Sequence, residues 1–156
     1  MNLIIRQAGD ADRAAAARLL TAQLIEHDLP ADPDRIARGI TSALQANSRA
    51  WLWLAERASI PVGVLLANEI ASVEHGGTVL WVEELYVFPE ARRTGIARAM
   101  LSRVREQTHQ RGVRAIELEV VPTQAAAFAL YRSFGFKEVN RRRMSLLVDR
   151  PYTPKP

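Results

Sequence analysis

The feature that most constrains the fold is a change of period within one short stretch, from the alternation of a strand to the spacing of a helix. Residues 81–87 are typical of a β-strand, and Pro89 ends it, because proline cannot donate to a sheet ladder. Apolar residues then recur at helical spacing over positions 96–104, and Gly112 is a suitable stop for that helix. Residues 115–121 alternate like a second strand. This order predicts one parallel β-α-β crossover.

Strand-like and helix-like segments continue along the whole chain. Because nothing divides the 156 residues, we expect one domain over 1–156, with a core at about 3–148 and a tail at 149–156. The order predicts an α/β or α+β domain with a mixed sheet covered by helices. The other expected elements are strands at 3–6, 51–55, 62–67, 78–87 and 144–148, a helix at 11–26, a helix capped by Asp32 that runs out near 47, and a helix at 125–134 closed by Gly135.

The composition excludes several classes of site. The chain has no cysteine, which rules out disulfides, thiolate metal sites and a cysteine nucleophile, and His27, His75 and His109 lie too far apart to predict a metal. No apolar run approaches the roughly 18 residues of a membrane helix. The N-terminus does not have the pattern of a signal peptide, so we expect a cytoplasmic protein without a membrane partner. The net charge of +4 comes mainly from scattered arginines, which disfavours a nucleic-acid partner.

The turn at residues 92–97 (Arg-Arg-Thr-Gly-Ile-Ala) has the chemistry of an anion-binding site. Gly95 lets the backbone approach a ligand closely, and the first helical turn offers unpaired N–H groups at the positive end of the helix dipole. Arg92 and Arg93 add positive charge there. This geometry suits a pyrophosphate, although taken alone such a turn is also an ordinary helix cap.

Two motifs at the right spacing resemble the GNAT superfamily of N-acetyltransferases. Its acetyl-CoA loop pattern, Gln/Arg-x-x-Gly-x-Gly/Ala, is met by Arg92, Gly95 and Ala97. Its downstream pattern, Asn-x-x-Ala-x-x-Leu-Tyr-x-x-x-Gly-Phe, is followed over residues 124–136 except that Gln124 replaces the asparagine. The resemblance spans about residues 3–148 and implies a mostly antiparallel central sheet with helices on both faces.

The resemblance also implies a cofactor site and its residues. Acetyl-CoA is expected as cosubstrate, with no metal, and backbone N–H groups at 85–87 are expected near the acetyl carbonyl, where a bulge in the strand lets them polarise it. The longer Gln124 side chain can still reach the pantetheine or the backbone, at a shifted position. The predicted cofactor-binding residues are Leu85, Tyr86, Val87, Arg92, Arg93, Thr94, Gly95, Ile96, Ala97, Arg98, Gln124, Ala127, Phe128 and Tyr131.

Three residues are the candidates for catalysis. Tyr131 matches the family tyrosine near the CoA sulfur, and a phenol is protonated at neutral pH, which suits an acid for a leaving thiolate. Glu83 and Glu84 are the base candidates, and one of them is expected to face the cleft, since adjacent strand residues point opposite ways. Glu83 matches the acidic position of the polyamine acetyltransferases better. The alternatives are a solvated carboxylate or one that only binds a cationic amine.

The predicted function is therefore transfer of an acetyl group from acetyl-CoA to a primary amine of a small molecule, peptide or protein, by direct attack in a ternary complex. The alternative is a non-catalytic acyl-CoA-binding or sensor module. The resemblance allows a homodimer, while the acceptor lies beyond what the motifs specify, because variable helices and loops shape its site.

Overall fold

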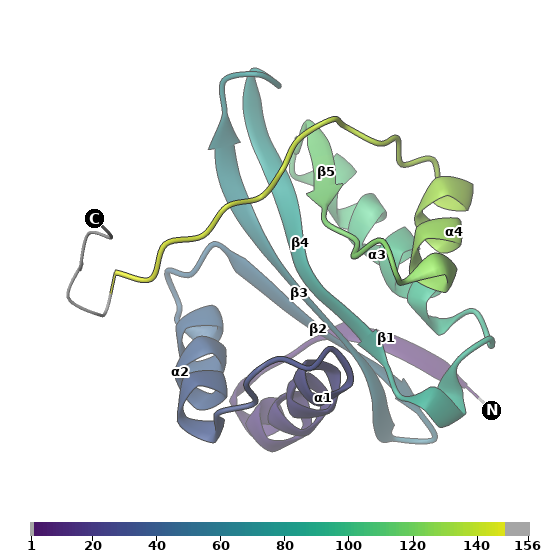
Figure 1. The fold of residues 1–156 in the computed structure, drawn as a ribbon. Coiled ribbons are helices and arrows are strands. Elements are labelled where there is room, and N and C mark those ends of the chain that lie inside the picture. Colours follow the sequence, from purple (N-terminus) through teal and green to yellow (C-terminus); the bar gives the residue numbers. More distant parts are fainter. Residues whose placement is uncertain (1, 149–156) are drawn as a thin grey trace.

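A five-stranded sheet forms the centre of the computed structural model, which describes residues 2–148 (Figure 1). The strands lie in sequence order, and only the last pair, β4 and β5, is parallel. The predicted mixed, mostly antiparallel sheet with a single parallel crossover is thereby confirmed. The strands are β1 (Leu3–Gln7), β2 (Ala50–Arg57), β3 (Ile60–Ser72), β4 (Gly77–Val87) and β5 (Ala115–Leu118).

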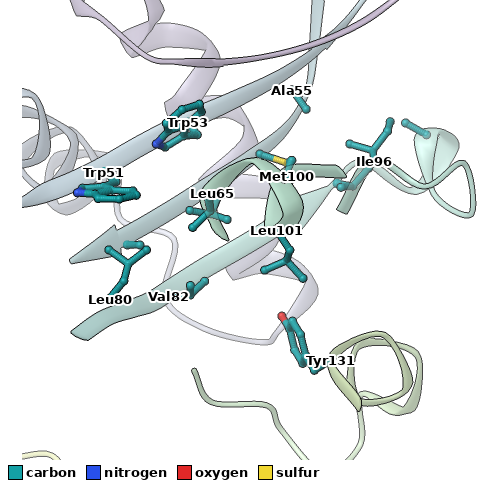
Figure 2. Close-up of a cluster of buried hydrophobic side chains, with 14 residues drawn as sticks. Trp51, Trp53, Ala55, Leu65, Leu80, Val82, Ile96, Met100, Leu101 and Tyr131 are labelled. Atoms are coloured by element: carbon teal, nitrogen blue, oxygen red, sulfur yellow. The ribbon is translucent and has the colours of Figure 1, made fainter. Parts of the chain in front are cut away.

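Helices cover both faces of this sheet, as expected. Figure 1 shows α1 (Arg13–Glu26) and α2 (Pro33–Leu44) on one face and α3 (Ile96–Gln110) and α4 (Ala125–Phe134) on the other. Two short 3-10 turns, η1 (Asp10–Asp12) and η2 (Pro89–Ala91), precede α1 and α3. Each layer has its own apolar core, and Figure 2 shows the one beneath α3, which includes Trp53, Leu65, Leu80, Met100 and Leu101.

The helix ends follow the predicted capping chemistry. Asp32 accepts a hydrogen bond from the backbone N–H of Arg35 at 2.9 Å, and Pro33 occupies the first helical position of α2, where its missing N–H costs nothing. Gly135 ends α4 with a left-handed φ of 109°. The helices predicted at these two places are confirmed.

The strand predicted at residues 144–148 is wrong. These residues form no strand, and the side chains of Met144 and Val148 are almost fully exposed. The segment before them is held by two ion pairs, Arg141 with Glu74 at 2.8 Å and Arg143 with Glu119 at 3.0 Å. Alternation alone does not make a strand, because its backbone groups need a neighbouring strand to pair with.

Two further expectations need adjustment. The strand predicted at 115–121 stops at Leu118, and the expected tail, residues 149–156, lies outside the described part of the chain. No helix within residues 2–148 combines the length and the apolar character that crossing a membrane requires.

A β-bulge divides β4 into two halves. Leu66 of β3 pairs with Glu84, but the next residue, Ala67, pairs with Val82, so Glu83 is an extra residue on β4. Since side chains alternate along a strand, one extra residue reverses the alternation. Leu80 and Val82 before the bulge, and Leu85 and Val87 after it, pack in the α3 layer, whereas Tyr86 packs in the α1–α2 layer.

Candidate active site

The parallel strands β4 and β5 are paired over only four residues each. Val79–Val82 pairs with Ala115–Leu118, and no further pairing between the two strands forms within the described residues. The last part of β4, residues 83–87, therefore has one edge that no strand of the described chain covers. Its backbone N–H groups on that edge pair with no strand of the described chain, which is a condition for the role predicted for residues 85–87.

Glu84 lies on the α1–α2 side of the sheet, where the bulge directs it. The buried Gln23 of α1 donates a hydrogen bond from Nε2 to its Oε2 at 2.5 Å. Burial, together with the charge of Glu83, raises the pKa of Glu84 to about 7, against the opposing effects of Arg143 and the Gln23 hydrogen bond. A carboxyl group with this pKa is poised to exchange protons near neutral pH.

Glu83, the bulge residue, has a different environment from its neighbour. Its side chain is exposed, and its Oε2 accepts a hydrogen bond from Asn68 Nδ2 at 3.0 Å. Because Glu83 is the extra residue of the bulge, simple alternation does not hold between the two carboxylates, and the partly buried one is Glu84.

Tyr131 extends from α4 toward the sheet within the α3-layer core (Figure 2). Its ring packs edge-on against Phe136, with centroids 5.7 Å apart, and the residue is only 9% exposed. Burial and the charge of Glu84 raise the pKa of Tyr131 to about 12, so the phenol keeps its proton throughout the neutral range.

The loop before α3 is shaped by two residues in the left-handed region. Arg93 has a φ of 60° and Gly95, the N-cap of α3, has a φ of 83°. Thr94 Oγ1 donates to the Ala91 carbonyl at 2.7 Å and accepts from Arg57 Nη2 at 2.8 Å, which fixes the turn. The first N–H groups of α3, beginning at Ile96, lack helical partners and are the candidate donors to a phosphate.

Arg98 and Gln124, both predicted cofactor residues, make contacts between elements. Arg98 of α3 donates to Ser133 Oγ of α4 at 2.5 Å, which ties the two helices together. Arg98 and Gly95 also line one end of an open groove of about 750 Å³ between β1 and α3. Gln124, at the start of α4, lies 2.7 Å from the His27 ring, so it links the ends of α4 and α1.

The Arg92 side chain has a role that sequence reasoning did not anticipate. Its Nε donates to the Val87 carbonyl at 2.8 Å, its Nη2 pairs with Glu26 at 2.6 Å, and its guanidinium lies over the Tyr86 ring. Tyr86 also donates its hydroxyl to Glu26 at 3.2 Å, and this cluster lowers the pKa of Glu26. Arg92 thus joins the end of α1 to the end of β4. No sequence signal marks this pairing, because the residues are 66 positions apart.

Replacing Arg92 with alanine is therefore expected to lower the free energy of unfolding by about 1 kcal/mol, since the ion pair is partly exposed. Glu26→Ala should cost a similar amount, and the double variant should cost less than the sum of the two, because both variants remove the same interaction. Urea unfolding measures these values. Arg93→Ala, at an exposed position of the same loop, is the matched control, and a strictly additive double variant would contradict the pairing.

Other groupings in the described chain offer little chemistry. No cluster of three or more His, Asp or Glu side chains suited to a metal occurs within residues 2–148.

Sequence reasoning also missed Gln23, which lies within an alanine-rich helix and gives no sign that it meets Glu84 across 61 positions.

Comparison with known proteins identifies the family of this fold and loop. The sequence profile of the Acetyltransferase (GNAT) family matches residues 14–136. Among curated proteins, the ribosomal protein bS18-alanine N-acetyltransferase of Escherichia coli K12 is 44% identical over 57 residues, which are 36% of this chain and 38% of that protein. Human N-acetyltransferase 8 is 29% identical over 65% of this chain and 45% of its own length. The matches thus span less than half of these curated relatives.

Solved structures share the fold over nearly the whole chain. An integron cassette protein from the mobile metagenome of the Cole Harbour salt marsh superposes with a TM-score of 0.82 and 25% identity, covering 94% of this chain and 91% of its own. An aminoglycoside N-acetyltransferase in complex with CoA superposes with a TM-score of 0.81 and 19% identity, covering 94% of this chain and 95% of its own.

Proposed function

The chain belongs to the acetyltransferase (GNAT) family, and on that premise we propose that it transfers an acetyl group from acetyl-CoA to a primary amine of a small molecule, peptide or protein. The observation that supports this most is the partly buried Glu84, with a pKa of about 7, on the part of β4 whose edge is uncovered. The curated relatives named above support an amine acceptor by their names.

The cofactor site is proposed at the start of α3. The N–H groups of residues 96–98 bind the pyrophosphate, helped by the positive end of the helix dipole. Arg93, whose side chain is exposed, supplies charge at the loop, whereas Arg92 acts through its contact with Glu26. Gln124 of α4 reaches the pantetheine arm once its contact with His27 opens.

The acetyl carbonyl is proposed to lie against the edge of β4. Backbone N–H groups of residues 85–87 on the uncovered edge donate to the carbonyl oxygen and stabilise the negative charge that develops during attack. These donors are held by the bulged strand and need no rearrangement, which is the condition for effective electrostatic stabilisation.

The chemical step needs a base and an acid on opposite sides of the thioester. The amine nitrogen attacks the carbonyl carbon, a C–N bond forms and the C–S bond breaks. Glu84 accepts the proton released by the nitrogen, directly or through water, and Tyr131 gives its proton to the departing thiolate. Glu84 is preferred to Glu83 because its pKa of about 7 suits a base, and because Glu83 is solvated.

Tyr131→Phe is expected to lower kcat about 10- to 100-fold while the dissociation constant of CoA changes less than twofold. The variant removes the hydroxyl that protonates the thiolate and keeps the ring that packs against Phe136. Stopped-flow turnover and calorimetric CoA binding separate the two quantities. Equal kcat values for the variant and the unmodified protein would remove Tyr131 from the acid role.

The proposed function as a whole is tested by purified protein with acetyl-CoA and a panel of primary amines. Release of free CoA thiol that depends on the amine is the expected result. Tight CoA binding without turnover of any amine would instead support the acyl-CoA-binding module. Salt-dependent DNA or RNA binding without CoA binding would contradict both.

A further inference from the structure

A cavity of about 260 Å³ lies between α1, α2 and the sheet, in the layer that Glu84 faces. This volume exceeds the roughly 150 Å³ of an engineered apolar cavity that holds benzene. Its walls are mainly aliphatic, and the lining includes Leu20 and Leu24 of α1, Ile36 and Ile40 of α2, and Leu52 and Leu66 of the sheet. The charged residues of the lining are Glu84 and Arg35.

Gln23 provides an independent sign of a ligand beside Glu84. The residue is only 4% exposed, and its Nε2 is used by the Glu84 carboxylate. Its Oε1 is buried and accepts no hydrogen bond within the described chain. A buried acceptor without a donor is costly, and such groups in native proteins often await a ligand or a water molecule. Next to a carboxylate, the missing partner is a group that donates protons.

We propose that this cavity binds the apolar group of the acceptor, so that the acceptor is a primary amine on an aliphatic or aromatic body of roughly six carbons. Its nitrogen donates to Glu84 and to Gln23 Oε1, and its apolar body is buried between α1 and α2. This inference rests on the proposed function and specifies its acceptor. The chemistry is common to a free alkylamine and to the N-terminal residue of a peptide with an apolar side chain.

The lining also argues against a polyamine acceptor. A second ammonium group would enter an aliphatic cavity whose lining holds one carboxylate, that of Glu84. An apolar body, by contrast, gains free energy in proportion to the surface that it buries. The expected preference for an apolar amine over a polyamine is thus set by the residues that surround Glu84 rather than by Glu84 itself.

The experiment compares acetylation of hexylamine, ethylamine, 1,4-diaminobutane and leucinamide. We expect kcat/KM for hexylamine to exceed the values for ethylamine and 1,4-diaminobutane at least tenfold. Leucinamide distinguishes the two kinds of acceptor. A kcat/KM for leucinamide above that for hexylamine indicates an N-terminal residue, and a lower kcat/KM indicates a free amine. Calorimetric titration of hexylamine into the protein with CoA measures binding without turnover.

Gly39→Leu tests the cavity directly. Gly39 lines it, and a Cβ added there meets no atom within 4 Å, so the variant narrows the cavity without a clash at that atom. The preference for hexylamine over ethylamine should fall about tenfold, and hexylamine binding should weaken. Ala37→Leu, on the same helix at an exposed position outside the lining, is the matched control and should keep the preference.

The outcomes separate this inference from the proposed function. Amine-dependent thiol release with equal kcat/KM for hexylamine and ethylamine, and no effect of Gly39→Leu, overturns the cavity assignment and leaves the acetyltransferase. Hexylamine binding that is lost in Gly39→Leu, without turnover of any amine, supports the cavity and overturns the transferase. Absence of binding and of turnover for both hexylamine and leucinamide overturns the cavity assignment.

Discussion

Glu84→Gln is expected to lower kcat/KM for amine acetylation about 10²- to 10³-fold, which is the usual effect of removing a general base. The amide fits the same space beside Gln23 but cannot accept the proton of the attacking amine. Turnover at saturating acetyl-CoA measures the effect. Glu83→Gln is the matched comparison, and a larger loss in Glu83→Gln than in Glu84→Gln would transfer the base role to the exposed residue.

The pH dependence gives a second readout of the same substitution. Glu84, with a pKa of about 7, accepts protons only when ionised, so its contribution to kcat/KM should rise with pH and level off above about 7. The ionisation of the amine adds a rise that both proteins share. The ratio of kcat/KM for the unmodified protein to kcat/KM for Glu84→Gln therefore isolates the contribution of Glu84. A ratio independent of pH between 5 and 8 would contradict the assignment of Glu84 as the base.

The same variant is expected to be more stable than the unmodified protein in alkaline solution. The folded-state pKa of Glu84 is raised above the ordinary value of 4.5. The contribution of this carboxyl group to the stability of the unmodified protein is therefore complete below about pH 4.5 and is lost as pH rises through about 7. The glutamine of the variant stays uncharged at every pH, so the variant does not lose this stability. Urea unfolding at pH 8 should show a gain of about 2 kcal/mol, after allowance for partial solvent screening, and little gain at pH 4.5.

Gly95→Asp is expected to weaken CoA binding at least 100-fold. The φ of 83° at this N-cap is costly for any residue with a Cβ, and the new carboxylate lies where the pyrophosphate is proposed to bind. Like charges at the end of the helix repel, and the loop N–H groups would turn to the carboxylate instead. Isothermal calorimetry with CoA measures the change.

Gly112→Asp is the control for backbone strain. Gly112 follows the other end of the same helix with a φ of 68°, and a Cβ at this position would also lie in open space. Its loss of stability should be similar, while its affinity for CoA should stay within twofold of that of the unmodified protein. Gly95→Asp with unchanged CoA affinity would exclude the loop from the cofactor site.

Local signals predicted most of the fold. Asp32 and Pro33 at the start of α2, and Gly135 after α4, determine helix ends through neighbouring atoms, and these were predicted correctly. The segment at 144–148 was predicted wrongly, because a strand depends on a partner that its own residues do not specify. The pairing of segments that lie far apart in the chain is the part of the fold that could not be predicted from a single sequence.

The candidate site likewise has features that local sequence signals predict and features that depend on long-range packing. Alternation predicted that Glu83 and Glu84 face opposite ways, but the bulge at Glu83, which depends on the register between β3 and β4, interrupts that alternation. The pairings of Glu84 with Gln23 and of Arg92 with Glu26 join residues more than 60 positions apart. Such contacts follow only from the packing of α1 on the sheet. The turn at residues 92–97 and the helix start after it could be predicted because their signals are local.

The bulge at Glu83 makes the effect of a deletion in β4 depend on where the deletion falls. Losing a residue from the turn between β3 and β4 shortens a hairpin and leaves the sheet faces as they are. Losing Glu83 would join Val82 directly to Glu84 and restore regular pairing, with Leu85 and Tyr86 still in their own layers. Losing Leu85 instead would turn Tyr86 from the α1–α2 layer toward the α3 layer. The residue count between the bulge and the turn at residues 92–97 therefore keeps each side chain in its layer, even where the identities of those residues vary.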